Sequence, residues 1–301
     1  MENWLASTGI VIVVLLIVLW PVRSSGRNLL RRWGIAEPRP DQVDHAIRYL
    51  WRRRLVFVLL YVVLAPVATL LDGRDEGSGG LVAFFVPLLV AMLLAELFAV
   101  VRPVRGPRVA SLDPRGWRDL IPRSAVAVGA VLVLLVVVLS TLGLVAQPWA
   151  DRYAAALPPN SEQFEVSDDY RADMTSTTSW TALAGAALCL VLVVVLVHLA
   201  VRRPAVPDEA VDAALRTRTA RVAVGIGFGW LGAAVMVAGH RIRFLDQLDV
   251  GPPERAMPPA PGWLDWLGGW MEIGVFVVQL AAVACWVMLA MPTRREVAPV
   301  A

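Results

Sequence analysis

Seven long apolar runs constrain the fold of this 301-residue chain more than any other feature of its sequence. They cover about residues 4–20, 55–71, 81–101, 124–146, 180–201, 222–239 and 270–291. An α-helix rises about 1.5 Å per residue, so each run is about long enough to cross a hydrocarbon layer of roughly 30 Å. Only 18% of the residues are charged and 57% are hydrophobic. The sequence therefore predicts an all-α integral membrane protein, in which residues 1–301 form one seven-transmembrane helix bundle.

The distribution of basic residues gives this predicted bundle an orientation. All 28 basic residues are arginines, and 22 of them lie in residues 21–54, 102–123, 202–221 and 292–301. The remaining loops hold six arginines and 13 acidic residues; these loops are 72–80, 147–179 and 240–269. Because positively charged loops are retained in the cytoplasm, we expect the N-terminus outside and the C-terminus in the cytoplasm. Residues 21–54 and 202–221 are then Arg-rich cytoplasmic segments, and residues 147–179 form an acidic extracellular loop.

The first apolar run is predicted to be a retained anchor and not a cleaved signal peptide. No basic residue precedes it, its arginines follow the apolar core, and no Ala-x-Ala cleavage site is present. The absence of lysine and the abundance of Ala, Val, Leu and Gly are typical of a GC-rich bacterial genome. We therefore expect a multi-pass protein of a bacterial plasma membrane.

A short sequence pattern, V-D-x-A-[I/L]-R-x4-R, occurs twice, at residues 43–53 and 211–221. Each copy follows a Pro-Asp pair and is predicted to be a helix that continues into the next span, with i,i+4 ion pairs Asp44–Arg48 and Asp212–Arg216. If the pattern marks a duplication, spans one to three repeat as spans five to seven in the same orientation, with span four as the linker. Alternatively, Ala, Asp and Arg are simply frequent in cytoplasmic helices of this composition. The 3+1+3 arrangement and the chance match both remain open.

Three polar residues inside the predicted spans form a candidate intramembrane site. Glu96 lies about five residues from the cytoplasmic end of span three, where an isolated anion is disfavoured, so it should be protonated or paired. His198 has a similar depth in span five and is the expected partner, while Gln279 is in the middle of span seven. Such a set would relay protons or bind a cation. The alternatives are a neutral Glu96 bonded within the bundle, two side chains that reach the interface separately, and a Gln279 amide that joins two helices.

Two further patterns bear on helix packing and on the outer interface. Gly225, Gly229 and Ala233 form a small-residue stripe that is predicted to let another helix approach closely. The overlapping G-x-G-x-x-G at 227–232 lies inside an apolar span without a preceding strand, so a phosphate-binding turn is excluded there. Tryptophans at 263, 266 and 270 recur at helical spacing and predict a separate short interfacial helix before the last span.

The sequence lacks the usual signatures of catalysis and of cofactor binding. It contains no H-E-x-x-H and no G-x-S-x-G, and a Walker lysine is impossible without lysine. Cys189 and Cys285 fall in apolar spans and the three histidines are scattered, so no metal and no cofactor are predicted. The net charge of +3 resides in loops between spans, which argues against a nucleic-acid partner.

The predicted function is that of a non-catalytic accessory or scaffold subunit of the plasma membrane. Its expected partners are the lipid bilayer and another membrane or cytoplasmic protein that meets the Arg-rich segments. The alternative is a small-solute or proton-coupled transporter that uses Glu96, His198 and Gln279. A membrane-embedded enzyme is the third hypothesis and has the least support.

Overall fold

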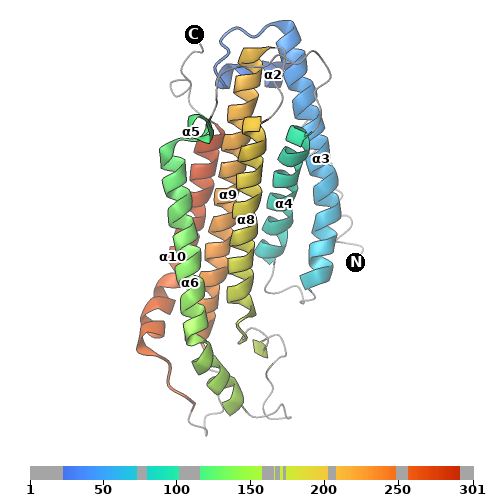
Figure 1. The fold of residues 1–301 in the computed structure, drawn as a ribbon. Coiled ribbons are helices and arrows are strands. Elements are labelled where there is room, and N and C mark those ends of the chain that lie inside the picture. Colours follow the sequence, from blue (N-terminus) through green and yellow to red (C-terminus); the bar gives the residue numbers. More distant parts are fainter. Residues whose placement is uncertain are drawn as a thin grey trace. The chain divides into compact units, whose positions relative to one another are not determined.

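A computed structural model of the chain describes residues 23–72, 80–101, 116–157, 166, 170–171, 174–202, 208–248 and 257–291 (Figure 1). Within these ranges, all regular secondary structure is α-helical and no strand occurs. The first predicted span, residues 4–20, lies outside the described residues, as do residues 292–301 and most of 158–173. The all-helical part of the predicted fold class is therefore confirmed for the described part of the chain.

The described helices coincide with six of the seven predicted spans. They are α2 (Arg23–Arg32), α3 (Pro40–Asp72), α4 (Gly80–Val101), α5 (Trp117–Leu120), α6 (Arg123–Ala156), α8 (Thr177–Arg202), α9 (Glu209–Asp246) and α10 (Gly262–Ala290). Four segments among the described residues are long and apolar enough to cross a membrane: α6, α8, Ala210–Asp246 of α9 and Ile273–Ala290 of α10. A shorter apolar segment, Pro87–Val100, lies in α4.

The surfaces of these helices are those of a membrane protein. Large apolar side chains face outward on α6, α8 and α10, and they include Val131, Leu134, Val145, Leu188, Val191, Val194, Ile273, Phe276 and Leu280. Soluble monomers rarely expose apolar patches of this extent. By contrast, most of α9 is buried. Lipid is therefore the solvent that suits the outward faces of α6, α8 and α10.

The chain divides into two compact units. Unit 1 contains the described residues of Met1–Val126, Leu192–Ile226 and Trp286–Ala301. Unit 2 contains the described residues of Ala127–Val191 and Gly227–Cys285. Helices α6, α8, α9 and α10 each contribute residues to both units.

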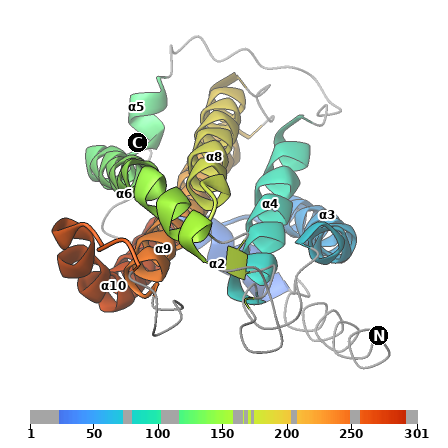
Figure 2. The same ribbon diagram turned by 90° about the horizontal axis from the view of Figure 1, so that it is seen from below.

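In unit 1, α3 packs against both α2 and α4, and α3 and α4 lie side by side in both views (Figures 1 and 2). Helix α2 ends because Gly34 adopts a left-handed φ of 101°, which lets the Ile35 amide donate to the Leu30 carbonyl at 3.0 Å. Gly26 allows α2 to approach α3 closely, since a Cβ there would lie 2.8 Å from Cγ1 of Ile47. Helix α3 then runs without a break from Pro40 to Asp72, so the predicted helix before span two does continue into it.

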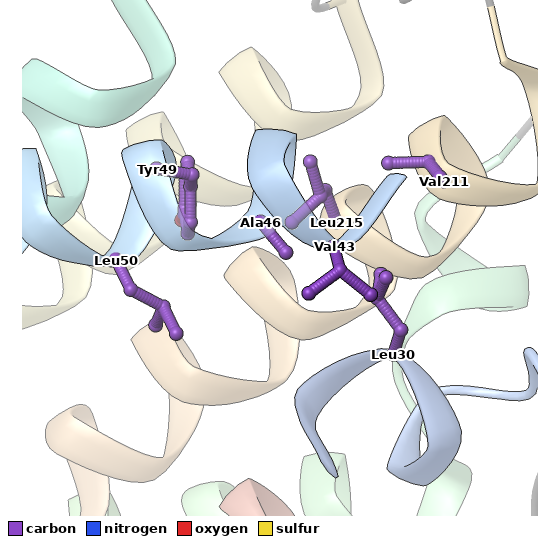
Figure 3. Packing of buried hydrophobic residues seen from close by; sticks show 7 residues of the cluster. All are labelled: Leu30, Val43, Ala46, Tyr49, Leu50, Val211 and Leu215. Carbon is purple, nitrogen blue, oxygen red and sulfur yellow. The ribbon is translucent and has the colours of Figure 1, made fainter. Parts of the chain in front are cut away.

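A small apolar core joins α2, α3 and α9 in unit 1 (Figure 3). Its buried members are Leu30, Val43, Ala46, Tyr49, Leu50, Val211 and Leu215. Val43 and Val211 are the first residues of the two copies of the V-D-x-A pattern, so the two copies meet at this core. The Asp212–Arg216 ion pair is confirmed, with Oδ2 and Nε 2.6 Å apart. Its predicted counterpart is not formed, because Asp44 and Arg48 are both exposed and no ion pair joins them in the described structure.

Three glycines of α9 contact side chains of α10, and one of them, Gly225, belongs to the predicted small-residue stripe. In unit 1, Gly225 packs on the indole of Trp286. In unit 2, Gly232 packs on Gln279 and Ala282, and Gly239 packs on Val275. Gly229 and Ala233 of the predicted stripe are also buried in α9, and Gly225, Gly232 and Gly239, which contact α10, recur every seven residues. A seven-residue repeat keeps small residues on one side of a helix that crosses its neighbour at a shallow left-handed angle.

The expectation of a separate interfacial helix before the last span is wrong. Helix α10 begins at Gly262 and continues to Ala290, so Trp263, Trp266 and Trp270 belong to its first turns. Trp266 and Trp270 are 70% and 65% exposed. The tryptophans therefore extend the outward face of the same helix, where an indole suits the boundary between water and lipid.

The glycine contacts of α10 predict a sharp difference between two substitutions in unit 2. Gly239→Val should lower the free energy of unfolding by about 1–3 kcal/mol, because added methyl groups would overlap Val275. Gly274→Val is the matched control, since no atom lies within 4 Å of a Cβ at that glycine. Thermal unfolding in detergent measures both. Equal destabilisation by the two variants would contradict the assigned packing.

Candidate functional site

The most unusual feature of unit 1 is a completely buried carboxylate, that of Glu96 on α4. Tyr49 and Arg53 approach it from α3, where their spacing of four residues places both on one face of the helix. Arg218 and Thr219 approach from α9. Three helices thus converge on a single carboxyl group.

Each oxygen of Glu96 has a protein partner. Oε1 forms an ion pair with Nε of Arg53, and Nη1 of Arg218 lies 3.6 Å from the same oxygen. The hydroxyl of Tyr49 donates to Oε2 at 3.2 Å. That hydroxyl in turn accepts a hydrogen bond from Nη1 of Arg218 at 3.0 Å and lies 3.4 Å from Oγ1 of Thr219. The guanidinium of Arg218 also stacks over the Tyr49 ring, 5.4 Å from its centre.

The charges of this Glu96 cluster do not cancel. Two guanidinium groups face one carboxylate, and the side chains of Arg53 and Arg218 are only 15% and 8% exposed. Glu96 lies one turn and a half before the end of α4 at Val101, where the helix dipole disfavours an anion. The two arginines compensate for that position and for desolvation. The cluster is therefore a site of net positive charge.

A second polar junction in unit 1 joins the first turns of α3 and α9. Asp208 caps α9, because its Oδ1 accepts from the Val211 amide at 3.1 Å. Its Oδ2 accepts from Nη2 of Arg39 at 2.8 Å and from Nε2 of Gln42 at 2.6 Å. Partial burial alone would raise the pKa of Asp208, but these hydrogen bonds and the Arg39 charge hold that pKa below its ordinary value. The carboxylate thus stays ionised and fixes the register of the two helix ends.

Within unit 1, the structure does not pair Glu96 with His198 of the predicted site. Glu96 is paired, but with Arg53 and Arg218 in place of His198. His198 is exposed on α8, whereas Glu96 is enclosed. Gln279 belongs to unit 2, where its Oε1 is shielded against Gly232 and has no hydrogen-bond partner among the described residues. Gln279 thus packs against Gly232 at the α9–α10 contact.

Sequence reasoning did not find Arg53, Arg218 and Tyr49 as partners of Glu96. Arg53 and Arg218 belong to the 22 arginines that predict the orientation of the protein. The charge rule by itself explains their positions in the sequence, so neither arginine required a specific partner. The available signal was the spacing, because Tyr49 and Arg53 continue the face of α3 that buries Ala46. An arginine on the apolar face of a helix requires a buried partner.

Arg241 holds a comparable position in unit 2. It is 2% exposed, and its Nη2 donates to Oε1 of Gln147 at 2.9 Å and to the Met174 carbonyl at 2.7 Å. Gln147 also donates to that carbonyl at 2.9 Å and to Asp151 at 2.7 Å. The side chain therefore joins α9, α6 and the residues before α8. Its neighbours His240 and Arg243 are more exposed.

No arrangement suited to a metal occurs in the described part of the chain, where no three His, Cys, Asp or Glu residues lie close enough to share an ion. Cys189 and Cys285 are free thiols, the first of them buried.

No protein-family model matches this sequence, and neither a curated protein nor a solved structure is similar to it. The Glu96 cluster is the candidate functional site of the described structure.

The geometry predicts that Glu96→Gln is strongly destabilising. The substitution keeps the size of the side chain but leaves Arg53 and Arg218 buried without a counter-charge, which should cost about 3–5 kcal/mol of unfolding free energy. Asp41→Asn is the matched control, because the Arg39–Asp41 pair is exposed on both sides and should contribute less than about 1 kcal/mol. Denaturant titration in mixed micelles measures both variants. Similar losses in the two would show that Glu96 is not the buried anchor described here.

Proposed function

We propose that this chain is a multi-pass plasma-membrane protein that serves as a non-catalytic accessory or scaffold subunit. The observation that carries the proposal is the complete enclosure of Glu96 by Arg53, Arg218 and Tyr49. A buried ionic group of this kind fixes the register of the helices that share it. Here the Glu96 cluster fixes the register of α3, α4 and α9 in unit 1. A surface that binds a partner needs helices held in such a fixed arrangement.

The same contacts argue against transport of protons or cations through Glu96. A carrier carboxylate must alternate between partners and solvent, whereas both oxygens of Glu96 are occupied by protein groups. A cation entering the cluster would also meet two guanidinium charges. His198, which belongs to the same unit as Glu96, is exposed and is not among the partners of that carboxylate in the described structure. The transporter alternative therefore lacks the assembled site that it needs.

We further propose seven crossings, with the N-terminus outside and the C-terminus in the cytoplasm. The arginine distribution supports this orientation, and the six described helices that coincide with predicted spans support the count. The meeting of the two V-D-x-A copies in one core is compatible with a 3+1+3 repeat. In this orientation, the core and the Asp208 junction lie on the cytoplasmic side of the membrane.

The cytoplasmic face of unit 1 offers the surface for a partner. Helix α2 buries Gly26 and Leu30 but exposes Arg27, Arg31 and Arg32. An exposed basic face on a helix that is fixed to α3 favours an acidic protein surface as the partner. No enzymatic step is part of this proposal.

Cysteine labelling tests the topology. In a background with Cys189 and Cys285 replaced by Ala, single cysteines at residues 34–50 should resist a membrane-impermeant maleimide in intact cells, because the positive segments face the cytoplasm. Single cysteines at residues 155–175 should react. Detergent permeabilisation provides the control, since every exposed position should then be labelled. The reverse pattern would overturn the orientation.

Proton flux into vesicles tests the scaffold function against the transporter alternative. Vesicles that contain the wild-type protein should acidify at the rate of empty vesicles, because Glu96 is held by its protein partners. A pH-sensitive dye trapped inside reports the rate, with and without a solute gradient. Flux several-fold above that of empty vesicles would instead establish a proton-coupled transporter.

A further inference from the structure

The outward face of α3 changes from basic to apolar within two helical turns. Arg48 and Arg52 are exposed and lie four residues apart, with Trp51 beside them at 43% exposure. Seven residues after each arginine, at nearly the same angle around the helix, stand Leu55 and Leu59, followed by Val63. These three apolar side chains are also exposed. One face of a single helix therefore presents two guanidinium groups, an indole and then a continuous apolar stripe.

This basic end of α3 carries more positive charge than the described residues neutralise. Arg48 and Arg52 have no ion-pair or hydrogen-bond partner among the described residues. Behind them, Arg53 and Arg218 share the single carboxylate of Glu96. Burial, followed by repulsion from Arg53 and Arg218, lowers the pKa of Arg54. An anion at the exposed face would relieve part of this repulsion.

We propose that the exposed face of α3 binds the headgroup of an anionic phospholipid of the cytoplasmic leaflet. Arg48 and Arg52 bind the phosphate, Trp51 lies at headgroup level, and an acyl chain follows Leu55, Leu59 and Val63. Guanidinium groups suit phosphate because they donate two parallel hydrogen bonds. The inference rests on the proposed function, since it requires that α3 enter the bilayer from the cytoplasm.

The combination of charge and apolar stripe selects a lipid over a soluble anion or an acidic protein. A free phosphate would use the guanidinium groups alone, and a cytoplasmic protein would not cover Leu55, Leu59 and Val63 within the bilayer. Helix α2 provides the contrast, because Arg27 and Arg31 are also exposed and four residues apart but no exposed apolar stripe follows them. These two arginines are therefore a matched control with the same charge and spacing.

The test compares lipid binding by the full-length protein and two double variants. Each is purified from vesicles of phosphatidylcholine with a minor fraction of phosphatidylglycerol, and native mass spectrometry measures the affinity for each lipid. Arg48→Gln/Arg52→Gln should weaken phosphatidylglycerol binding about tenfold or more, as expected when two charges are removed at an anionic surface. Arg27→Gln/Arg31→Gln should change it less than about twofold. Phosphatidylcholine binding should be unaffected in both.

Three results would overturn the inference. Unchanged phosphatidylglycerol binding in Arg48→Gln/Arg52→Gln would remove the site, and equal weakening by both double variants would assign the effect to diffuse surface charge. Complete displacement of the lipid by inorganic phosphate would assign the site to phosphate alone. Extraction of the membranes with alkaline carbonate separates these results from failure of the proposed function. A chain that carbonate releases is not a multi-pass protein, whatever its lipid preference.

Discussion

The burial of Glu96 between Arg53 and Arg218 is the interaction on which the arrangement of unit 1 depends. Three charges removed from water are tolerated only while all three remain together. A rotation of α3, α4 or α9 by one residue would leave a charge unpaired. The apolar core of Leu30, Val43 and Val211 tolerates small shifts, because hydrophobic contact has no preferred direction. The ionic cluster therefore sets the register, and the apolar core adds packing that has no preferred direction.

The surroundings of the helices explain where the polar residues lie. Apolar side chains of α6, α8 and α10 face outward, while polar groups such as Glu96, Ser140, Ser179 and Arg241 are directed inward. In hydrocarbon, an outward charge has no water to solvate it, so polar groups gather between helices or at the ends of spans. Arg241 and Asp208 illustrate the second case, because each ties helix ends through hydrogen bonds to backbone and side chains. The exposed apolar side chains Leu55, Leu59 and Val63 of α3 likewise point outward.

Much of the helical architecture follows from local pattern. The apolar runs predicted α4, α6 and α8 to within about ten residues, and the Pro-Asp segments predicted that α3 and α9 begin before their spans. The Asp212–Arg216 pair followed from i,i+4 spacing and is present. Contacts between helices do not follow from local pattern in this way. The partner of Glu96, the seven-residue spacing of the glycines against α10 and the packing of Gln279 depend on which faces meet, and one sequence does not specify this.

The sequence by itself determined the medium of this protein and the lengths of its helices, because hydrocarbon thickness and backbone hydrogen bonding impose a minimum length on any apolar span. The placement of the arginines predicted the orientation for a different reason, because a charge crosses a bilayer only at a high cost in free energy. Only the tertiary structure decided which arginines are structural. Arg53 and Arg218 are neighbours of Glu96, whereas Arg48 and Arg52 on the same stretch of α3 are left for the surroundings. Successive residues of an α-helix point about 100° apart, so Arg52 and Arg53 face different surroundings although they are neighbours in the sequence.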